Sequence, residues 1–122
     1  MIHRSTLRRA TKVSSESAVE DAKLVTLAKG AAARIGARAG AGVRDEMGRS
    51  YSGANVSAGS FELSALELAV AQALAAGATG LELAVVVGAE QVDLELLRAV
   101  AGGGLPVLHC FASGEIHERL ST

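Results

Sequence analysis

The sequence predicts one α/β domain in which a mixed β-sheet is packed with helices. The chain has 122 residues, which suits one modest core of two or three layers, and helix and strand patterns alternate along it. Hydrophobic residues make up 49% of the chain while Trp is absent, so Ala, Val and Leu must build the core. The predicted order of elements is α-β-β-α-β-α-β, followed by a short C-terminal element.

The chain is predicted to divide into a flexible basic arm, residues 1–16, and a single domain, residues 17–122. The arm has no sustained apolar period and carries His3, Arg4, Arg8, Arg9 and Lys12. We expect a solvated terminus, with RNA contact as the weaker alternative. A helix is predicted to begin at the capping-box pattern of Ser17 and Glu20 and to end at Gly36. Its apolar stripe comprises Leu24, Leu27, Ala28, Ala31 and Ile35.

A β-hairpin is predicted next, with strands 39–45 and 49–56 around a short turn that ends in Gly48. Asp45 and Glu46 are interpreted as decoration of this hairpin. The following helix, residues 65–76, is apolar nearly all the way round, so we expect it to be buried on most sides.

The C-terminal half continues the alternation of strands and helices. A Val-rich core strand is predicted over 81–87 and a helix over 94–101, with Asp93 as its N-cap. A strand over 105–111 follows the Gly-rich break after this helix. Residues 114–120 are expected to add an edge strand or a turn of helix.

Composition narrows the class of function. A formal net charge of -1 gives no electrostatic argument for nucleic-acid binding. Cys110 is the single cysteine, which leaves no internal disulfide and no cysteine pair for zinc. The N-terminus lacks the apolar segment of a secretory signal, and the longest apolar run, 68–81, is too short to span a bilayer. We therefore expect a cytoplasmic protein with no membrane partner.

The stretch from Gly48 to Gly77 resembles the active-site segment of the cytidine deaminases. Gly48, Gly53, Asn55 and Phe61 match the family's strand and loop before a helix. Ser64-Ala-Leu-Glu-Leu-Ala-Val then stands where the family has Cys or His, Ala and Glu at the start of that helix. The resemblance covers roughly residues 18 to 111, and it implies the cytidine deaminase fold. The loop between Asn55 and Ser64 is shorter than is usual in the family.

The resemblance also implies that the active site has been lost. In the family, the Cys or His and two later cysteines bind zinc, which activates a water, and the Glu transfers protons. The resemblance places the three zinc ligands at Ser64, Leu94 and Leu97, and the proton carrier at Leu66. Leucine has no donor atom, and a serine hydroxyl is a poor zinc ligand at neutral pH. These four vestigial positions therefore predict no zinc, no other cofactor and no catalytic residue.

Part of a nucleoside cleft is predicted to remain. The family's asparagine and glutamate around the ribose correspond to Asn55 and Ser57, so the carboxylate is absent. Arg98 stands where the family has an arginine after its last cysteine, and Phe61 lies in the loop before the helix. The base-stacking aromatic of many members corresponds to Ala37.

Two groups of residues suggest that a catalytic or metal-binding site could persist at shifted positions. Glu67 stands one position after the expected catalytic glutamate, but it completes a capping box with Ser64. A displaced metal site would need His109, Cys110, His117 or Glu67 as ligands. Neighbouring strand residues point to opposite faces, so His109 and Cys110 are not expected to share a metal. We expect a buried Cys110 and a His109 at the rim.

The leading hypothesis is a catalytically inactive, zinc-free homologue of cytidine deaminase that acts as an oligomeric structural or regulatory module. The resemblance implies a homodimer or homotetramer. One alternative is a nucleoside- or nucleotide-binding protein without turnover. Another is a zinc-dependent cytidine deaminase, converting cytidine to uridine by hydrolysis, with a displaced site.

Overall fold

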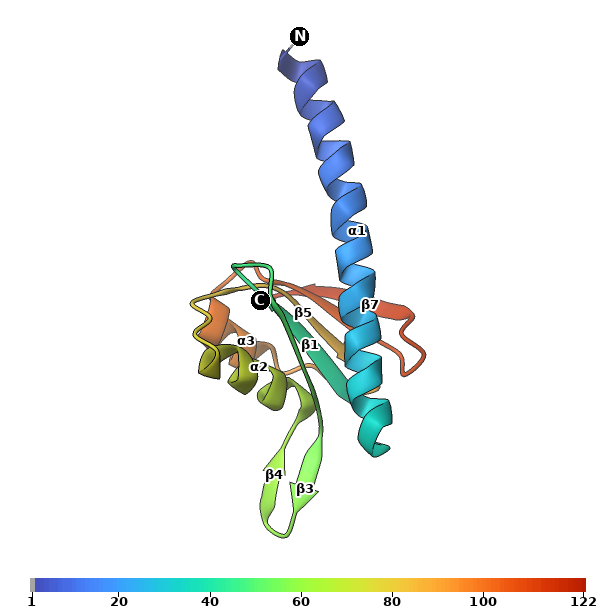
Figure 1. The fold of residues 1–122 in the computed structure, drawn as a ribbon, viewed down its shortest axis with the longest axis vertical. Helices are drawn as coiled ribbons and strands as arrows, with labels where there is room; N and C mark the ends of the chain where they lie inside the picture. Colours follow the sequence, from blue (N-terminus) through green and yellow to red (C-terminus); the bar gives the residue numbers. More distant parts are fainter. Residues whose placement is uncertain (1) are drawn as a thin grey trace.

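The computed structural model describes the backbone of residues 2–122 and the side chains of residues 17–122 (Figure 1). Its five-stranded sheet has the order β2-β1-β5-β6-β7 and is mixed, because β5 and β6 are parallel while the other pairs are antiparallel. The elements are α1 (Ile2–Ile35), β1 (Gly40–Asp45), β2 (Ser50–Ala54), β3 (Val56–Ala58), β4 (Phe61–Leu63), α2 (Ala65–Ala75), β5 (Leu81–Val87), α3 (Leu94–Ala101), β6 (Pro106–Cys110) and β7 (Ile116–Ser121). The predicted mixed α/β fold is confirmed.

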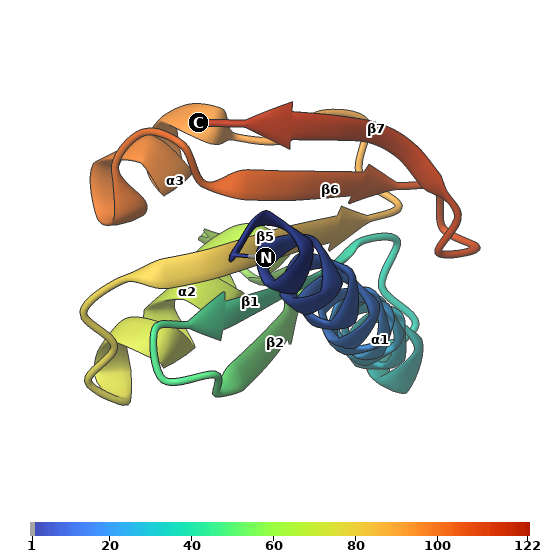
Figure 2. The ribbon, with the colours of Figure 1, turned by 90° about the horizontal axis from the view of Figure 1, so that it is seen from above.

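Helices cover both faces of the sheet, which gives three layers (Figure 2). Alternate residues of β5 and β6 divide between the faces: Val85 and Cys110 pack towards α1, while Val86 and Val107 pack with α2 and α3. Close approach is possible because β1 and β2 carry glycines under the helices. A Cβ atom on Gly53 would lie 2.9 Å from the Ala65 carbonyl oxygen of α2.

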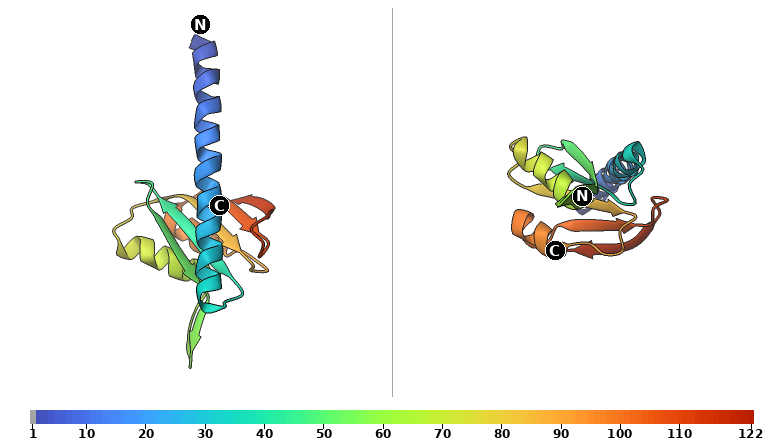
Figure 3. Two further views of the ribbon diagram at one scale, coloured as in Figure 1. Left: turned by 45° about the vertical axis from the view of Figure 1, so that its right-hand side comes forward. Right: turned by 90° about the horizontal axis from the view of Figure 1, so that it is seen from below.

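The first helix is longer than the sequence predicts. The capping-box pattern predicts a start at Ser17, whereas α1 begins at Ile2. Residues 2–16 contain neither Gly nor Pro, so nothing in them ends a helix, and a capping pattern inside a continuous helix has no free N–H groups to satisfy. The N-terminal part of α1 extends beyond the sheet (Figures 1 and 3). The side chains of the predicted basic arm lie outside the described residues.

Helix α2 has one buried face rather than burial on most sides. Ala65, Leu66, Ala69, Val70 and Ala73 are buried against the sheet and α3. Leu74 is 51% exposed. The prediction that α2 is buried on most sides is therefore wrong for the single chain, and apolar Leu74 faces outwards.

A second hairpin, β3–β4, was not predicted. It pairs Val56 with Leu63 and Ala58 with Phe61, and it projects from the body at the end opposite the start of α1 (Figure 1). Gly59, with φ +62°, supplies the turn. The loop predicted between Asn55 and Ser64 is this hairpin. Its strands have three residues each, which is too short for a recognisable strand pattern in the sequence.

The C-terminal segment forms the edge strand β7, one of the two predicted outcomes. Its pairing with β6 is irregular: His109 pairs with Glu118 but Cys110 pairs with Ile116, so His117 is the extra residue of a bulge. Within the described residues, no helix is long and apolar enough to cross a membrane.

Candidate functional site

A cleft of about 290 Å³ lies where the resemblance places the active site. It is bounded by the start of α2, the residues just before β1, the residue that follows β2 and the loop after β5. Its lining includes Arg38, Asn55, Ser64, Leu66 and the segment from Ala89 to Asp93. Open α/β sheets bind ligands outside the carboxyl ends of their parallel strands, and this cleft lies at that end of β5.

The side chain of Ser64 is engaged in capping α2. Its Oγ accepts a hydrogen bond from the Glu67 backbone N–H at 3.0 Å, and the Glu67 carboxylate accepts one from the Ser64 N–H at 2.8 Å. The predicted capping box is therefore present. Glu67 is held at the start of α2, which agrees with its interpretation as part of a capping box rather than as a shifted catalytic residue.

The other vestigial positions are apolar and packed. Leu66 is 4% exposed and Leu97 is fully buried, and both belong to the core cluster between the sheet, α2 and α3. Leu94, the first residue of α3, packs against the same cluster and is partly buried. The three leucines bring no donor atom and the serine hydroxyl already has a partner. The residues at these positions do not fit a zinc ion.

Asn55 remains at the cleft but its carbonyl is already engaged. Its Oδ1 accepts a hydrogen bond from the Ala39 N–H at 2.9 Å, which links the residue before β1 to the residue after β2. Ser57 lies on the projecting hairpin, and Phe61 there is 59% exposed. Arg98 lies on the exposed side of α3. Among the four predicted remnant residues, Asn55 lines this cleft, and Ser57, Phe61 and Arg98 do not.

Of the four candidate ligands of a displaced site, the structure brings His109 and His117 together but leaves Cys110 and Glu67 apart from them. Cys110 faces α1 in the core, and burial raises the pKa of its thiol, although the charge of Arg119 acts in the opposite direction. Glu67 is at the start of α2. Across the described residues, no group of three His, Cys, Asp or Glu side chains is arranged to hold a metal.

His109 differs from its prediction as a rim residue. It is 7% exposed, and its Nε2 lies 2.7 Å from the Ala89 carbonyl oxygen. The ring of His117 is 5.6 Å away, centre to centre. The strand alternation that separates Cys110 from His109 is as predicted, but β6 is covered at His109 by the loop after β5.

The turn between β1 and β2 is a second polar centre, and it is structural rather than decorative. The Asp45 carboxylate is buried and accepts hydrogen bonds from the Met47 and Arg49 N–H groups, the Arg49 side chain and the Tyr51 hydroxyl, each at 2.9 Å. Burial acts to raise the pKa of Asp45, but these hydrogen bonds together hold it below its ordinary value. Burial and the bond to Asp45 raise the pKa of Tyr51.

Glu46 joins this turn to the segment before β5. Its carboxylate accepts hydrogen bonds from the Thr79 N–H and hydroxyl and from the Gly80 N–H. Its own backbone N–H and the Thr79 hydroxyl are the main causes that lower the pKa of Glu46. Sequence reasoning missed these contacts because Thr79 is distant along the chain.

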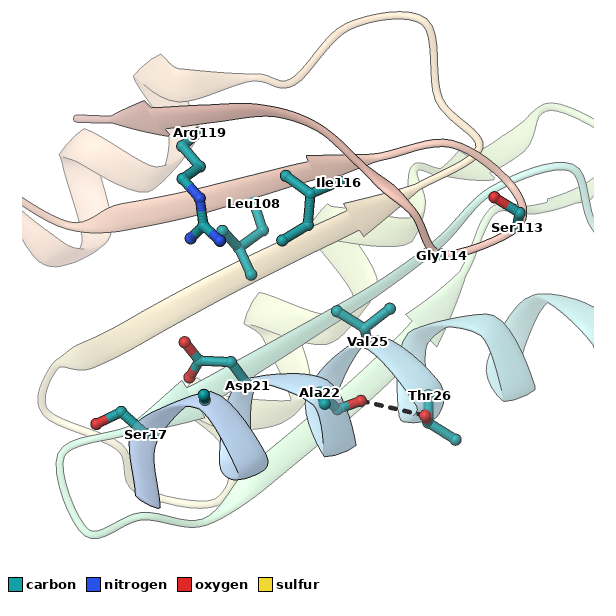
Figure 4. Close-up of a pocket in the computed structure, with 11 residues that line it drawn as sticks. Ser17, Asp21, Ala22, Val25, Thr26, Leu108, Ser113, Gly114, Ile116 and Arg119 are labelled. Atoms are coloured by element: carbon teal, nitrogen blue, oxygen red, sulfur yellow. Dashed lines mark hydrogen bonds between the residues drawn. The ribbon is translucent and has the colours of Figure 1, made fainter. Parts of the chain in front are cut away.

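A larger cleft, about 630 Å³, lies between α1 and the strands β6 and β7. Figure 4 shows Asp21 and Val25 of α1 facing Leu108, Ile116 and Arg119 of the strands. Asp21 accepts a hydrogen bond from Arg44 at 3.1 Å. No pattern in the sequence pointed to this cleft, because it results from how α1 crosses the sheet.

Comparison with known proteins gives one consistent result. The profile of the family described as cytidine deaminase-like matches residues 17–114. The structure is similar to the cytidine deaminase of Burkholderia pseudomallei, with a TM-score of 0.69, 23% identity and coverage of 81% of this chain and 90% of that chain. It is also similar to that of Mycobacterium leprae, with a TM-score of 0.63, 17% identity and the same coverage. Curated protein sequences contain no match.

Proposed function

This chain belongs to the cytidine deaminase-like family, and we propose that it is a catalytically inactive, zinc-free member that acts as an oligomeric structural or regulatory module. The observation that carries the proposal is the packing of Leu66 and Leu97 in one apolar core cluster. At these positions the family resemblance requires a proton carrier and a zinc ligand. Replacing a polar site by buried leucine adds apolar packing and removes the chemistry at the same time.

Exposed apolar side chains support the part of the proposal that concerns assembly. Leu74 on the outer side of α2 is 51% exposed, Ile35 at the end of α1 is 57% exposed, and Phe61 on the hairpin is 59% exposed. A two-stranded hairpin is at best marginally stable in water without a covering surface. A second copy of the chain would bury such groups and support the hairpin.

The first experiment measures cytidine deamination by the full chain in the presence of added zinc. We expect no conversion above the buffer control, because no residue at the vestigial positions can bind zinc or transfer a proton. Zinc-dependent formation of uridine would contradict the proposal of inactivity.

The second experiment measures the mass of the protein in solution by sedimentation equilibrium. We expect a dimer or tetramer that Leu74→Asp weakens, because the substitution places a charge in the proposed interface. Ala99→Asp, at an exposed position of α3, is the matched control and is expected to leave assembly unchanged. A monomer at all concentrations would contradict the assembly role.

The remaining cleft favours one second candidate, a nucleoside-binding protein without turnover. The cleft of about 290 Å³ retains Asn55, whose carbonyl is fixed by Ala39 and whose amide N–H₂ donors can still serve a ligand. A rise in Tm with millimolar cytidine or uridine, lost in Asn55→Ala, would support this candidate. A flat response would remove it.

A further inference from the structure

Two histidines from neighbouring strands lie together on the sheet face away from α1. His109 on β6 and His117 on β7 both line a cleft of about 300 Å³ at the ends of these strands. Glu90, in the loop after β5, lines the same cleft. This group is separate from the four vestigial positions, since none of those lines the cleft.

The β-bulge is what brings the two imidazoles to one face. Leu108 pairs with Arg119 and Cys110 pairs with Ile116, and these residues face α1. In a regular ladder His117 would pair with Cys110 and would face α1 as well. Because His117 is the extra residue, its side chain is redirected to the side of His109.

His109 is held in one tautomer with a free nitrogen. A carbonyl oxygen only accepts hydrogen bonds, so at 2.7 Å from the Ala89 oxygen the Nε2 of His109 carries the hydrogen. The lone pair of the neutral ring is then on Nδ1. Among the described residues no buried side-chain nitrogen or oxygen lacks a partner, and none donates to this Nδ1, so Nδ1 reaches solvent. Metal-binding histidines are oriented in the same way, by a bond from the other ring nitrogen to a carbonyl.

The spacing of the rings agrees with a shared metal ion. Zinc lies about 2.0–2.1 Å from a coordinating nitrogen, and so about 3.2 Å from the ring centre. Two rings that share one ion at a tetrahedral or trigonal angle are therefore centred about 5.2–5.6 Å apart. The centres of His109 and His117 are 5.6 Å apart. The ring of Phe111 also contacts that of His117, with the two ring centres 4.7 Å apart.

We propose that His109 and His117 form a two-histidine site for a divalent transition metal such as zinc. Neutral imidazoles are suitable ligands for such ions, and the carboxylate of Glu90 adds negative charge to the same cleft. The described residues provide no third ligand in place. Water or a small anion completes the coordination, so the site exchanges its metal readily. This site is independent of the proposed inactivity of the vestigial cleft.

The test is a zinc titration of the full chain after removal of metal, in competition with a chromophoric chelator at neutral pH. We expect one zinc per chain and at least a tenfold loss of affinity in His117→Ala, since even the loss of an outer partner of a ligand costs about 10–100-fold. His117 is exposed, so its substitution should leave the Tm unchanged. His3→Ala replaces the third histidine of the chain and is the matched control.

Side-chain NMR provides a second readout, because zinc should shift the imidazole signals of His109 and His117 and leave those of His3 in place. Zinc binding of unchanged strength in His117→Ala would overturn the two-histidine site, as would no binding by the unsubstituted chain. Deamination of cytidine by zinc-loaded His117→Ala would instead overturn the proposed inactivity, so the two failures are distinguishable.

Discussion

The vestigial cleft and the turn between β1 and β2 each contain a side chain that is almost inaccessible to solvent, but the two regions differ in polarity. At the cleft, the buried side chain is Leu66, which packs with Leu97 in the core behind it, and neither leucine needs a hydrogen-bond partner. At the turn, the buried side chain is the Asp45 carboxylate, which accepts four hydrogen bonds. The fold supplies the hydrogen-bond partners that the buried Asp45 carboxylate needs. At the vestigial positions, where polar ligands would have no metal to bind, the buried side chains are apolar.

This comparison distinguishes a buried polar group that stabilises the fold from polar groups that would serve catalysis. The hydrogen bonds to Asp45 come from its own turn and from Tyr51 of the adjacent strand, so the buried charge defines the hairpin geometry. The leucines beside the cleft instead join α2 and α3 to one core. The predictions below test this difference, from the largest expected effect to the smallest, with all stabilities compared at one protein concentration.

Leu66→Glu restores the family's residue type at the acid–base position and should be the most damaging change. Leu66 is 4% exposed, and an unpaired buried charge costs about 3–5 kcal/mol. Urea unfolding at pH 7 measures the loss. Leu66→Met keeps the volume and should cost less than about 1.5 kcal/mol. A glutamate tolerated without loss would mean that the position is polar and hydrated, not part of the core.

Leu97→Ala should destabilise the fold by about 2–5 kcal/mol, because it leaves a cavity at a fully buried position. Arg98→Ala, on the exposed side of the same helix, should change the free energy of unfolding by no more than about 0.5 kcal/mol. Equal effects of the two substitutions would contradict the packing of α3 against the sheet.

The pH dependence of stability should contain a contribution from Asp45. The pKa of its carboxyl is below the ordinary value of 3.8 in the folded chain, so the contribution is present above that pH and is lost as the pH falls through the lower, folded-state pKa. Asp45→Asn should be less stable at pH 7 and should lose less stability on acidification. Parallel pH profiles for the two proteins would show that the carboxylate is not held by its hydrogen bonds.

Ser64→Ala removes one half of the capping box and should cost about 1 kcal/mol, within a range of about 0.5–2 kcal/mol. Ser64→Asp keeps an acceptor for the Glu67 N–H and is the conservative control. Thermal unfolding of both variants provides the measurement. A larger loss in Ser64→Asp than in Ser64→Ala would argue against a capping role for this side chain.

Local patterns in the sequence predicted most of the fold. Ser64 and Asp93 cap their helices as predicted, because an N-cap depends on residues three positions apart. The predicted start of α1 was wrong, because a capping pattern does not mark the beginning of a helix when no helix-breaking residue precedes it. The loss of donors at Leu66, Leu94 and Leu97 could be stated from the resemblance alone.

Features that depend on tertiary contacts could not be predicted. Strand alternation placed Cys110 and His109 on opposite faces correctly, but the bulge that turns His117 towards His109 depends on the register of β7 against β6. The bond from His109 to Ala89 depends on the loop after β5. Neither long-range pairing has a signature in one sequence.

The central claim is that the family's zinc site has been replaced by core, and the zinc content of His117→Ala tests it most directly. This variant, purified without chelators, lacks one ligand of the proposed two-histidine site while the vestigial positions are intact. We predict near-zero zinc per chain. About one zinc per chain, retained through gel filtration and accompanied by conversion of cytidine to uridine, would contradict the claim, because the metal would then act at the family's site near Ser64, Leu94 and Leu97.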